Sequence, residues 1–194
     1  MRTFAMLAAV AALTACQKEP APETNEAVPA DGVAPTAPGP ATTSEAAPRR
    51  SVFSPLDETA CKLIEENKEE GPYWRRACPG SGGYSVEWTE SDLRQGLEVV
   101  DPKGGKTSLD LSGKVANGAF NMVGPRIEWR GPAEGSPEAL IVRVNSARQE
   151  GGADRSQLAV ARLVPAPCLI GVIGIGPDQN ARAAALADQG GACL

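Results

Sequence analysis

Histidine is absent from this sequence of 194 residues. Because histidine is the usual general base of enzymes, its absence excludes the Ser-His-Asp and Cys-His arrangements of nucleophilic catalysis. It also removes a common zinc ligand, and the cysteines lack the CxxC spacing typical of zinc sites. We therefore expect a protein that is not an enzyme and that has no metal site and no cofactor.

An excess of positive charge is also missing, since 19 Lys and Arg residues stand against 24 Asp and Glu residues, a net charge of −5. Proteins that bind nucleic acid usually carry a basic patch, and proteins held at membrane surfaces by charge carry polybasic segments. The sequence shows neither pattern. Nucleic acid is therefore not an expected partner.

The first residues have the layout of an export signal. Arg2 gives a positive start, and the uncharged apolar run 4–13 has the length of a signal-peptide core. At about 1.5 Å per helical residue this run is too short to cross a bilayer core of about 30 Å. The motif Leu13-Thr14-Ala15-Cys16 at its end resembles the lipobox of bacterial lipoproteins.

The resemblance to bacterial lipoproteins implies processing at Cys16. The sulfur receives a diacylglyceryl group, residues 1–15 are removed as the signal peptide, and the new amino terminus is acylated. Two or more acyl chains hold a protein stably on a membrane. Gln17 is not the aspartate of inner-membrane lipoproteins, so the resemblance implies an outer-membrane location facing the periplasm. The membrane is thus an expected partner through Cys16.

Composition divides the rest of the chain into two parts. Residues 16–50 are rich in proline and alanine and contain no aromatic residue, so they cannot bury enough apolar surface to offset the entropy of ordering. They are predicted to be the lipidated N-terminus and a disordered tether. Residues 51–194 hold all the tryptophans and tyrosines and the four other cysteines, and their length suits a single globular domain.

Residue patterning in this domain predicts an α+β fold, mainly an antiparallel β-sheet with one C-terminal helix. Alternating apolar residues, bounded by Gly, Pro, Asn or Ser, predict strands at 83–88, 97–100, 126–130, 139–145 and 157–164. The run 168–173 lacks polar alternation, which predicts a central strand buried on both faces.

A helix is predicted after that run. Pro177 at its first turn and Gly190 beyond its end bracket residues 180–188. Small side chains gather on one side of this helix, which we expect to lie close to the sheet: Ala181, Ala184 and Ala185.

The four cysteines of the domain are Cys61, Cys78, Cys168 and Cys193. Export to an oxidising compartment favours disulfides, and four cysteines allow three pairings. We expect Cys61–Cys78 and Cys168–Cys193, since each pair joins neighbours in the sequence. The second pair would fix the C-terminal helix to the strand at 168–173. In the chain-entropy model, each closure contributes about 3 kcal/mol.

A charged strand face is the candidate binding patch. Arg126, Glu128 and Arg130 alternate with Ile127 and Trp129, so the charged residues share the face opposite the apolar ones. Two further arginines complete the candidate patch: Arg94 and Arg143. The patch could bind an acidic or sugar ligand, or it could be a solvated sheet face with cross-strand ion pairs of small energetic weight.

Glu90 and Asp92 are the candidate carboxylates for a histidine-free enzyme. Paired carboxylates act as acid and base or nucleophile in glycoside cleavage. In the stretch Thr89–Arg94, however, such side chains more often bond to backbone amides in a turn or cap. We therefore predict a structural role for both.

From about Phe53 to Cys193 the domain is similar to a group of exported proteobacterial proteins of unassigned function. The similarity is carried by Cys78-Pro79-Gly80, Gly83-Tyr84, Asp92-Leu93-Arg94, Glu128-Trp129-Arg130, Cys168, Asn180-Ala181-Arg182, Ala187-Asp188 and Cys193. Leu169 occupies a position where these relatives commonly have histidine. The resemblance implies the fold boundaries and the four-cysteine framework, and it implies no activity.

These observations favour a non-catalytic binding module for another envelope component, either a protein or a glycan such as peptidoglycan. An alternative from another class is an inhibitor of hydrolases such as lysozyme. Its inserting element would be the segment 101–118, which is rich in Gly, Lys, Ser and Asn and is expected to be a long surface loop. The third alternative is the carboxylate enzyme that would use Glu90 and Asp92.

Overall fold

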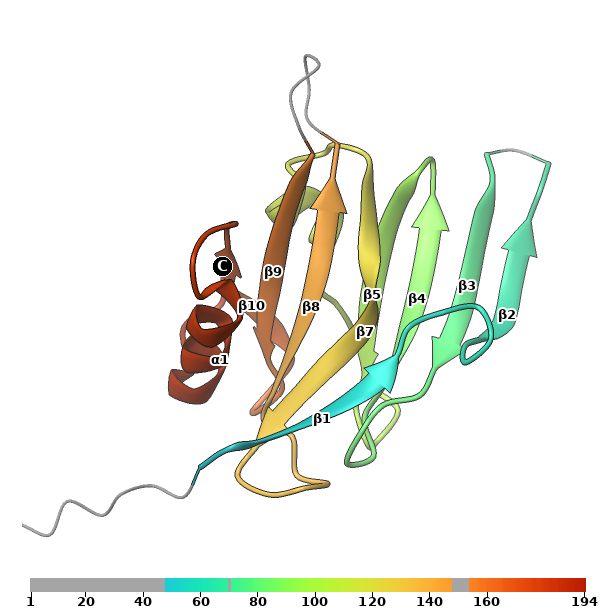
Figure 1. Cartoon of the computed structure of the whole chain (residues 1–194). Helices are drawn as coiled ribbons and strands as arrows, with labels where there is room; N and C mark the ends of the chain where they lie inside the picture. The colour runs from blue at the N-terminus through green and yellow to red at the C-terminus, as the bar shows by residue number, and fades with distance from the viewer. Residues whose placement is uncertain (1–47, 70, 148–153) are drawn as a thin grey trace, which may run out of the picture. The chain divides into compact units, whose positions relative to one another are not determined.

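A ten-stranded mixed β-sheet and one C-terminal α-helix form the described domain (Figure 1). The structure is a computed structural model, and it describes residues 48–69, 71–147 and 154–194. The predicted signal peptide, the predicted lipidation site Cys16 and the predicted tether as far as residue 47 lie outside the described residues. The predicted fold class, a mainly antiparallel sheet with one C-terminal helix and two disulfides, is confirmed.

Figure 1 labels most of the elements, which follow one another along the chain. They are β1 (Arg50–Pro55), β2 (Lys62–Asn67), β3 (Tyr73–Cys78), β4 (Ser85–Ser91), β5 (Arg94–Val100), β6 (Lys106–Ser108), the π-helical turn η1 (Leu111–Val115), β7 (Asn121–Gly131), β8 (Ala139–Ser146), β9 (Arg155–Arg162), β10 (Cys168–Ile173) and α1 (Gln179–Gln189). Within the described ranges, no helix is long and apolar enough to cross a membrane.

The sheet is organised around β7, which pairs with three strands. The strand order is β10-β9-β8-β7-β5-β4-β3-β2, with β1 paired to β7 and β6 paired to β5. β8 lies along one side of β7, while the other side meets β5 at Asn121 and β1 over Arg126–Gly131. The contact between β5 and β7 is parallel, and the other pairings are antiparallel.

Two groups of buried apolar side chains hold the fold together. The larger group includes Trp88, Leu97, Leu111, Trp129, Val142 and Leu163. The smaller group lies between α1 and the sheet and includes Ile141, Leu158, Val160, Ile170, Ala183 and Ala187. Since both groups draw side chains from β8 and β9, these two strands are buried on both faces, as their almost unbroken apolar runs require.

The prediction that residues 168–173 form a central strand is wrong, because β10 lies at the edge of the sheet. Its Leu169 and Ile170 are buried all the same, one in each apolar group. The outer edge is also covered, since the backbone amide of Leu194 donates to the carbonyl of Leu169 (2.9 Å). The apolar run therefore reflects the burial of both faces of β10, one by the larger apolar group and the other by α1. A sequence pattern cannot distinguish this burial from a central position in the sheet.

The buried side of α1 also differs from the predicted one. Ala183 and Ala187 are buried, whereas Ala181 and Ala185 are exposed and Ala184 is half-buried. The helix begins at Gln179, two residues after Pro177, so the predicted first-turn role of this proline is wrong, while Gly190 ends the helix with φ of 70°. Close contact with the sheet depends instead on Gly171, where a β-carbon would lie 2.4 Å from a methyl group of Leu186.

The segment 101–118 is not the long surface loop that its composition predicts. Residues 106–108 form β6 and pair with β5. Beyond them Leu109, Leu111 and Val115 are buried in the larger apolar group. Lys103, Gly104 and Gly105 occupy a short turn, while three apolar side chains anchor the segment in the core.

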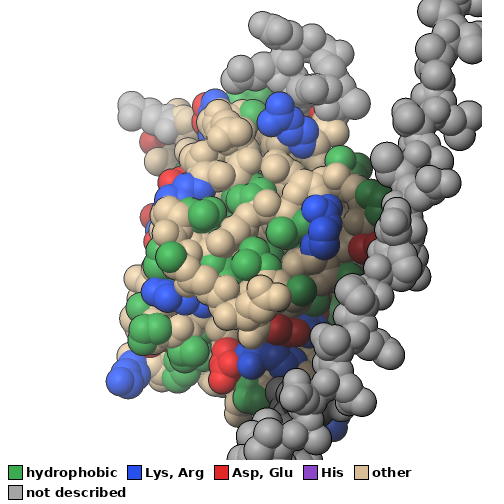
Figure 2. Space-filling model, turned by 90° about the vertical axis from the view of Figure 1, so that its left-hand side faces the viewer, with side chains coloured by type: hydrophobic (Ala, Val, Ile, Leu, Met, Phe, Trp, Pro, Cys, Tyr) green, Lys and Arg blue, Asp and Glu red, His purple; other side chains and the backbone are tan. Residues whose placement is uncertain are grey.

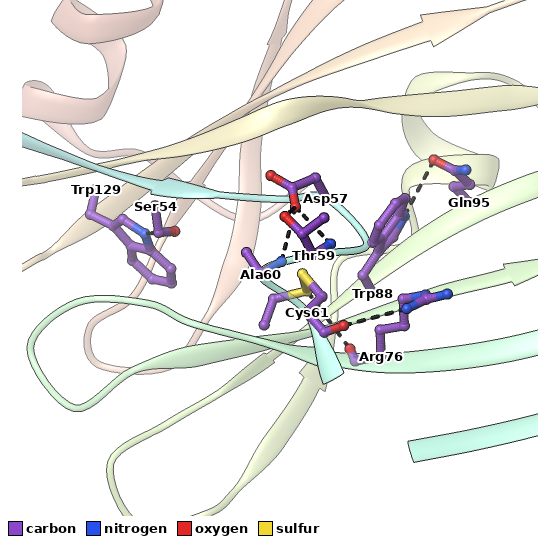
Figure 3. Close-up of a disulfide and its surroundings, with 10 residues drawn as sticks. Ser54, Asp57, Thr59, Ala60, Cys61, Arg76, Trp88, Gln95 and Trp129 are labelled. Carbon is purple, nitrogen blue, oxygen red and sulfur yellow. Dashed lines mark hydrogen bonds between the residues drawn. A yellow bond between two sulfur atoms is a disulfide. The ribbon is translucent and has the colours of Figure 1, made fainter. Parts of the chain in front are cut away.

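Both expected disulfides are present. Cys61–Cys78 links the start of β2 to the end of β3, and Cys168–Cys193 ties β10 to the residues that follow α1. Figure 3 shows the turn before Cys61, where the Asp57 carboxylate accepts hydrogen bonds from the backbone amides of Thr59 and Ala60, both 2.9 Å. This turn positions the first disulfide beside the paired ends of β2 and β3.

The hairpin between β4 and β5 closes through the two residues Asp92 and Leu93, with Ser91 opposite Arg94. Both turn residues have positive φ, 50° and 59°. A two-residue hairpin of this kind matches a type I′ turn, whose twist suits the flanking strands. Asp tolerates the left-handed conformation, whereas a leucine there is strained by about 1–2 kcal/mol.

Glu87 is buried on the outer side of β4, where simple alternation predicts an exposed residue. Its side chain is 9% exposed and lies 2.9 Å from the guanidinium of Arg75, and Lys106 contacts its other oxygen. Burial alone would raise the pKa of Glu87, but hydrogen bonds from Lys106 and Arg75 and their charges outweigh burial and hold the pKa below its usual value of 4.5. Two cations from β3 and β6 thus keep this carboxylate ionised inside the sheet.

We expect Leu93→Gly to raise the free energy of unfolding by about 0.5–1 kcal/mol, because relief of left-handed strain exceeds the entropy cost of glycine. Leu93→Ala is the matched control, since it keeps a β-carbon at the same φ. The leucine side chain is 63% exposed, so its removal alone should change stability by less than about 0.5 kcal/mol. Urea denaturation measures all three proteins, and equal stability of the two variants would contradict the strain argument.

We expect Glu87→Gln to lower the free energy of unfolding at pH 7 by about 1–3 kcal/mol, since two charge-assisted hydrogen bonds lose their charge. The lowered pKa means that Glu87 stabilises the fold above its unfolded-state pKa and loses this effect as the pH falls through its folded-state pKa. The difference between the variant and the natural protein should therefore shrink below about pH 4.

Urea denaturation between pH 7 and pH 3 measures this dependence. Glu134→Gln is the control, because Glu134 is exposed and has no ion pair within the described part of the chain. A constant difference across this pH range would show that the ionised form of Glu87 is not the source of the stability.

Candidate binding groove

A groove of about 260 Å³ lies between α1, β1 and the face of β7 and β8 that bears the charged residues. Its floor is apolar, formed by Ile141, Leu158 and Ala183 of the smaller apolar group. Polar side chains line it from several elements: Arg126 and Glu128 from β7, Arg143 from β8 and Asn180 from α1. Because Ile141, Leu158 and Ala183 are at most 5% exposed, the surface that the groove offers to a ligand is mainly polar.

An irregularity in β7 opens this groove. Register with β8 shifts between Val123 and Ile127, so Gly124, Pro125 and Arg126 form a bulge. A β-carbon at Gly124 would lie 2.9 Å from the β-carbon of Arg143 across the strand pair. Glycine therefore allows the close approach of β8, and the bulge redirects Arg126, as bulges next to sites often do.

Arg126 lies over the ring of Phe53, with its guanidinium carbon 4.8 Å from the ring centroid. Both residues are exposed and line the groove, and Phe53 comes from β1, which pairs with this half of β7. Within the described part of the chain, Arg126 has no carboxylate at ion-pair distance. The aromatic face thus orients a guanidinium whose charge is not neutralised by a neighbouring acid.

Arg143 is held by three uncharged acceptors. Its guanidinium donates to the Ser156 hydroxyl (2.8 Å), the Gln179 side-chain oxygen (3.1 Å) and, more distantly, the Asn180 side-chain oxygen (3.4 Å). These contacts join β8, β9 and the first turn of α1. As with Arg126, no carboxylate of the described residues lies at ion-pair distance from it, so a second uncompensated positive charge lines the groove.

Glu128 and Arg130 are engaged in contacts that hold the domain together. The Ser51 hydroxyl donates to Glu128 (2.6 Å), and Arg130 lies 3.2 Å from the same carboxylate. Arg130 also donates two hydrogen bonds to Asp188 of α1 (2.9 and 2.7 Å). These hydrogen bonds raise the pKa of Arg130, and they outweigh the burial of the guanidinium, which alone would lower it. This bidentate pair clamps the end of α1 to β7.

Arg94, the remaining residue of the candidate patch, does not belong to the groove. It lies opposite Asn121, five residues along β7 from Arg126, which corresponds to about 17 Å of extended strand. Its guanidinium donates to the Gly118 carbonyl (3.0 Å), pairs with Asp92 and lies over the ring of Phe120 (4.8 Å). The structure therefore brings together Arg126, Glu128, Arg130 and Arg143 and leaves Arg94 elsewhere.

Glu90 and Asp92 each make local contacts. Glu90 accepts a hydrogen bond from the Gln95 amide (2.8 Å), and Asp92 pairs with Arg94 within the hairpin turn while its side chain is 76% exposed. In the described ranges, no cluster of three or more Cys, Asp or Glu side chains could hold a metal ion. Glu90 and Asp92 thus both contact residues of the hairpin that β4 and β5 form.

Figure 2 shows the side of the domain that bears α1. Basic side chains on this side are separated by uncharged and apolar surface and are not gathered into one patch. Scattered charges of both signs produce no strong field over a distance at this side.

Sequence reasoning missed Phe53, Gly124 and Asn180 as groove residues. Phe53 and Asn180 come from β1 and α1, and their approach to β7 is a tertiary effect that strand patterning does not contain. Gly124 did carry a signal, since a Gly-Pro pair directly before a charged strand is typical of a bulge or break.

Comparison of the chain with protein-family models, curated proteins and solved structures found no match.

Proposed function

We propose that this protein is a non-catalytic, lipid-anchored binding module of the cell envelope. Its anchor is Cys16 in the outer membrane, and its domain faces the periplasm and binds another envelope component. The observation that carries the proposal is the groove, which is lined by Arg126 and Arg143, neither of which has a carboxylate at ion-pair distance among the described residues.

The composition of the groove supports binding. The exposed ring of Phe53 offers apolar contact, while Arg126 and Asn180 offer hydrogen-bond donors at the rim. The second guanidinium, Arg143, is already oriented by fixed neighbours, so little side-chain entropy remains to be lost when a ligand binds. A site with such preformed parts binds without rearrangement of the sheet.

The predicted anchor and tether support the same function. A flexible coil of the length of residues 17–50 has a root-mean-square span of about 30 Å. The domain would stay close to the membrane and meet components of the envelope at a high effective concentration. A protein or glycan of the envelope is therefore the class of partner that such a groove would encounter most often.

The inhibitor hypothesis depended on a free loop at residues 101–118. Leu109, Leu111 and Val115 are buried in the core, so this segment cannot extend into the cleft of a hydrolase without unfolding part of the domain. We do not propose inhibition as the function.

Photo-crosslinking in cells tests the proposed binding. A photoreactive amino acid replaces Phe53 in the full-length protein, and the matched control places it at Leu63 of β2, which is 41% exposed and far along the strand order from the groove. We expect one dominant adduct, a protein or a glycan fragment, from position 53 and not from position 63. No adduct from an abundant, folded protein, or the same adducts from both positions, would contradict the proposal.

Cys16→Ser tests the anchor. We expect the variant to lose incorporation of labelled palmitate and to leave the membrane fraction, because no acyl chain remains to hold it. Fractionation of outer and inner membranes measures the location of the natural protein. Palmitate incorporation that persists in Cys16→Ser would contradict the predicted lipidation site.

A further inference from the structure

The two disulfides of the domain lie in different surroundings. Cys61 and Cys78 are 2% and 3% exposed and belong to the larger apolar group. In the second disulfide, Cys193 is exposed and Cys168 is half-buried. Exchange with an external thiol requires that the attacking thiolate reach a sulfur atom. Of these two disulfides, Cys168–Cys193 is therefore the one that a thiol in solution can attack.

A guanidinium lies at this exposed disulfide. Arg162 of β9 is opposite Cys168 in the ladder that β9 forms with β10, and its guanidinium donates to the sulfur of Cys193 (3.3 Å). In the described part of the chain, the two carboxylates that line the same surface hollow, Glu138 and Asp188, pair with Arg49 instead. A positive charge stabilises thiolates, and reactive cysteines usually have such a neighbour.

An external dithiol can reduce this disulfide in two balanced steps. Its thiolate attacks the sulfur of Cys193, a bond forms between these two sulfurs, and the Cys168–Cys193 bond breaks with its electron pair on Cys168. The second thiol of the reductant then attacks the reductant sulfur of the mixed disulfide and releases Cys193. The protein gains two electrons and two protons as two thiols, and the dithiol becomes a disulfide. Arg162 suits both steps, because it contacts the attacked sulfur and lies opposite the departing one.

The disulfide also fixes the segment 190–194 to the sheet. This segment follows α1 and lies beside β10 (Figure 1), where the Leu194 amide donates to the carbonyl of Leu169 (2.9 Å). Arg162 holds the Gly191 carbonyl (3.2 Å). The helix before the segment is held separately, by the pair of Arg130 with Asp188 and by its buried alanines. Reduction would thus free the segment and leave α1 in place.

We propose that Cys168–Cys193 is a site of thiol–disulfide exchange with an external dithiol, and that its reduction releases residues 190–194 from the edge of β10. Cys193 is the sulfur that the dithiol attacks, and Arg162 attracts the incoming thiolate. Cys61–Cys78 is a structural disulfide that does not take part.

Partial reduction tests the selectivity of the site. The full-length lipidated protein, in detergent micelles, is treated with dithiothreitol and alkylated at intervals, and mass spectrometry of its peptides follows each cysteine. We expect Cys168 and Cys193 to be alkylated at least about tenfold faster than Cys61 and Cys78, because the buried pair reacts only after local opening. Equal rates, or faster reaction of the buried pair, would overturn the proposal.

Reduced glutathione locates the attacked sulfur. This monothiol forms the mixed disulfide of the first step, acid stops the exchange, and peptide mapping shows which cysteine carries the adduct. We expect the adduct on Cys193. An adduct on Cys168 would overturn the assigned point of attack.

Variants of Arg162 test the role of its charge. Arg162→Gln should slow reduction of Cys168–Cys193 about three- to tenfold, and Arg162→Lys, which keeps the charge, should restore most of the rate. The control is Arg155→Gln, at the exposed other end of β9. A purely structural role predicts the opposite sign, because loss of the Gly191 contact would loosen the segment and speed the reaction. Faster or unchanged reduction in Arg162→Gln would overturn the role of Arg162.

Hydrogen exchange measures the release of the segment. On reduction we expect the Leu194 amide to exchange at least about tenfold faster, since its bond to Leu169 is lost, while the Ala187 amide within α1 keeps its protection. Unchanged protection of Leu194 in the fully reduced protein would overturn the proposed release.

Discussion

The pairing of β7 with three strands is the constraint on which the rest of the domain depends. One side of β7 follows β8 along its length, while the other side is shared between β5 at its start and β1 at its end. A strand that changes partners must twist or bulge between them, and this one bulges at Gly124–Arg126. Because the bulge faces α1 and not the larger apolar group, the irregularity that the topology requires becomes the wall of the groove.

Arginines on the same strand face have different roles because of what lies opposite them. Arg130 meets Asp188 and Glu128 and is neutralised in a clamp that holds α1 to the sheet. Arg126, four residues earlier, meets only an aromatic ring among the described residues. A partly buried ion pair fixes geometry at small net gain in stability, whereas a charge left without an acid retains its attraction for a ligand. The clamp and the open charge together make a rigid groove with unused binding capacity.

The sequence predicted those elements whose apolar patterning is marked. β5 and the second half of β7 alternate, β8 and β9 carry apolar residues that are buried on both faces, and α1 ends at Gly190. β1 inverts the alternation, because Ser54 points into the core to accept a hydrogen bond from Trp129 while Phe53 points outward. β2 is exposed at all six residues, so it carries no apolar signal.

The charged face of the groove was predicted from β7 alone, since alternation places Arg126, Glu128 and Arg130 on one side. Arg94 lies apart from them, beside the start of β7, and patterning does not state which end of β7 lies beside β5. Phe53 and Asn180 could not be assigned, since they reach the groove only after β1 and α1 have docked. What remained hidden in the sequence is thus the tertiary pairing around β7, and that pairing creates the groove.

A small, shallow site of this kind suits the proposed anchor, because a short flexible tether holds a domain and its neighbours at effective concentrations on the order of millimolar. A groove that binds weakly is then occupied on the membrane without needing the large contact area of a soluble complex.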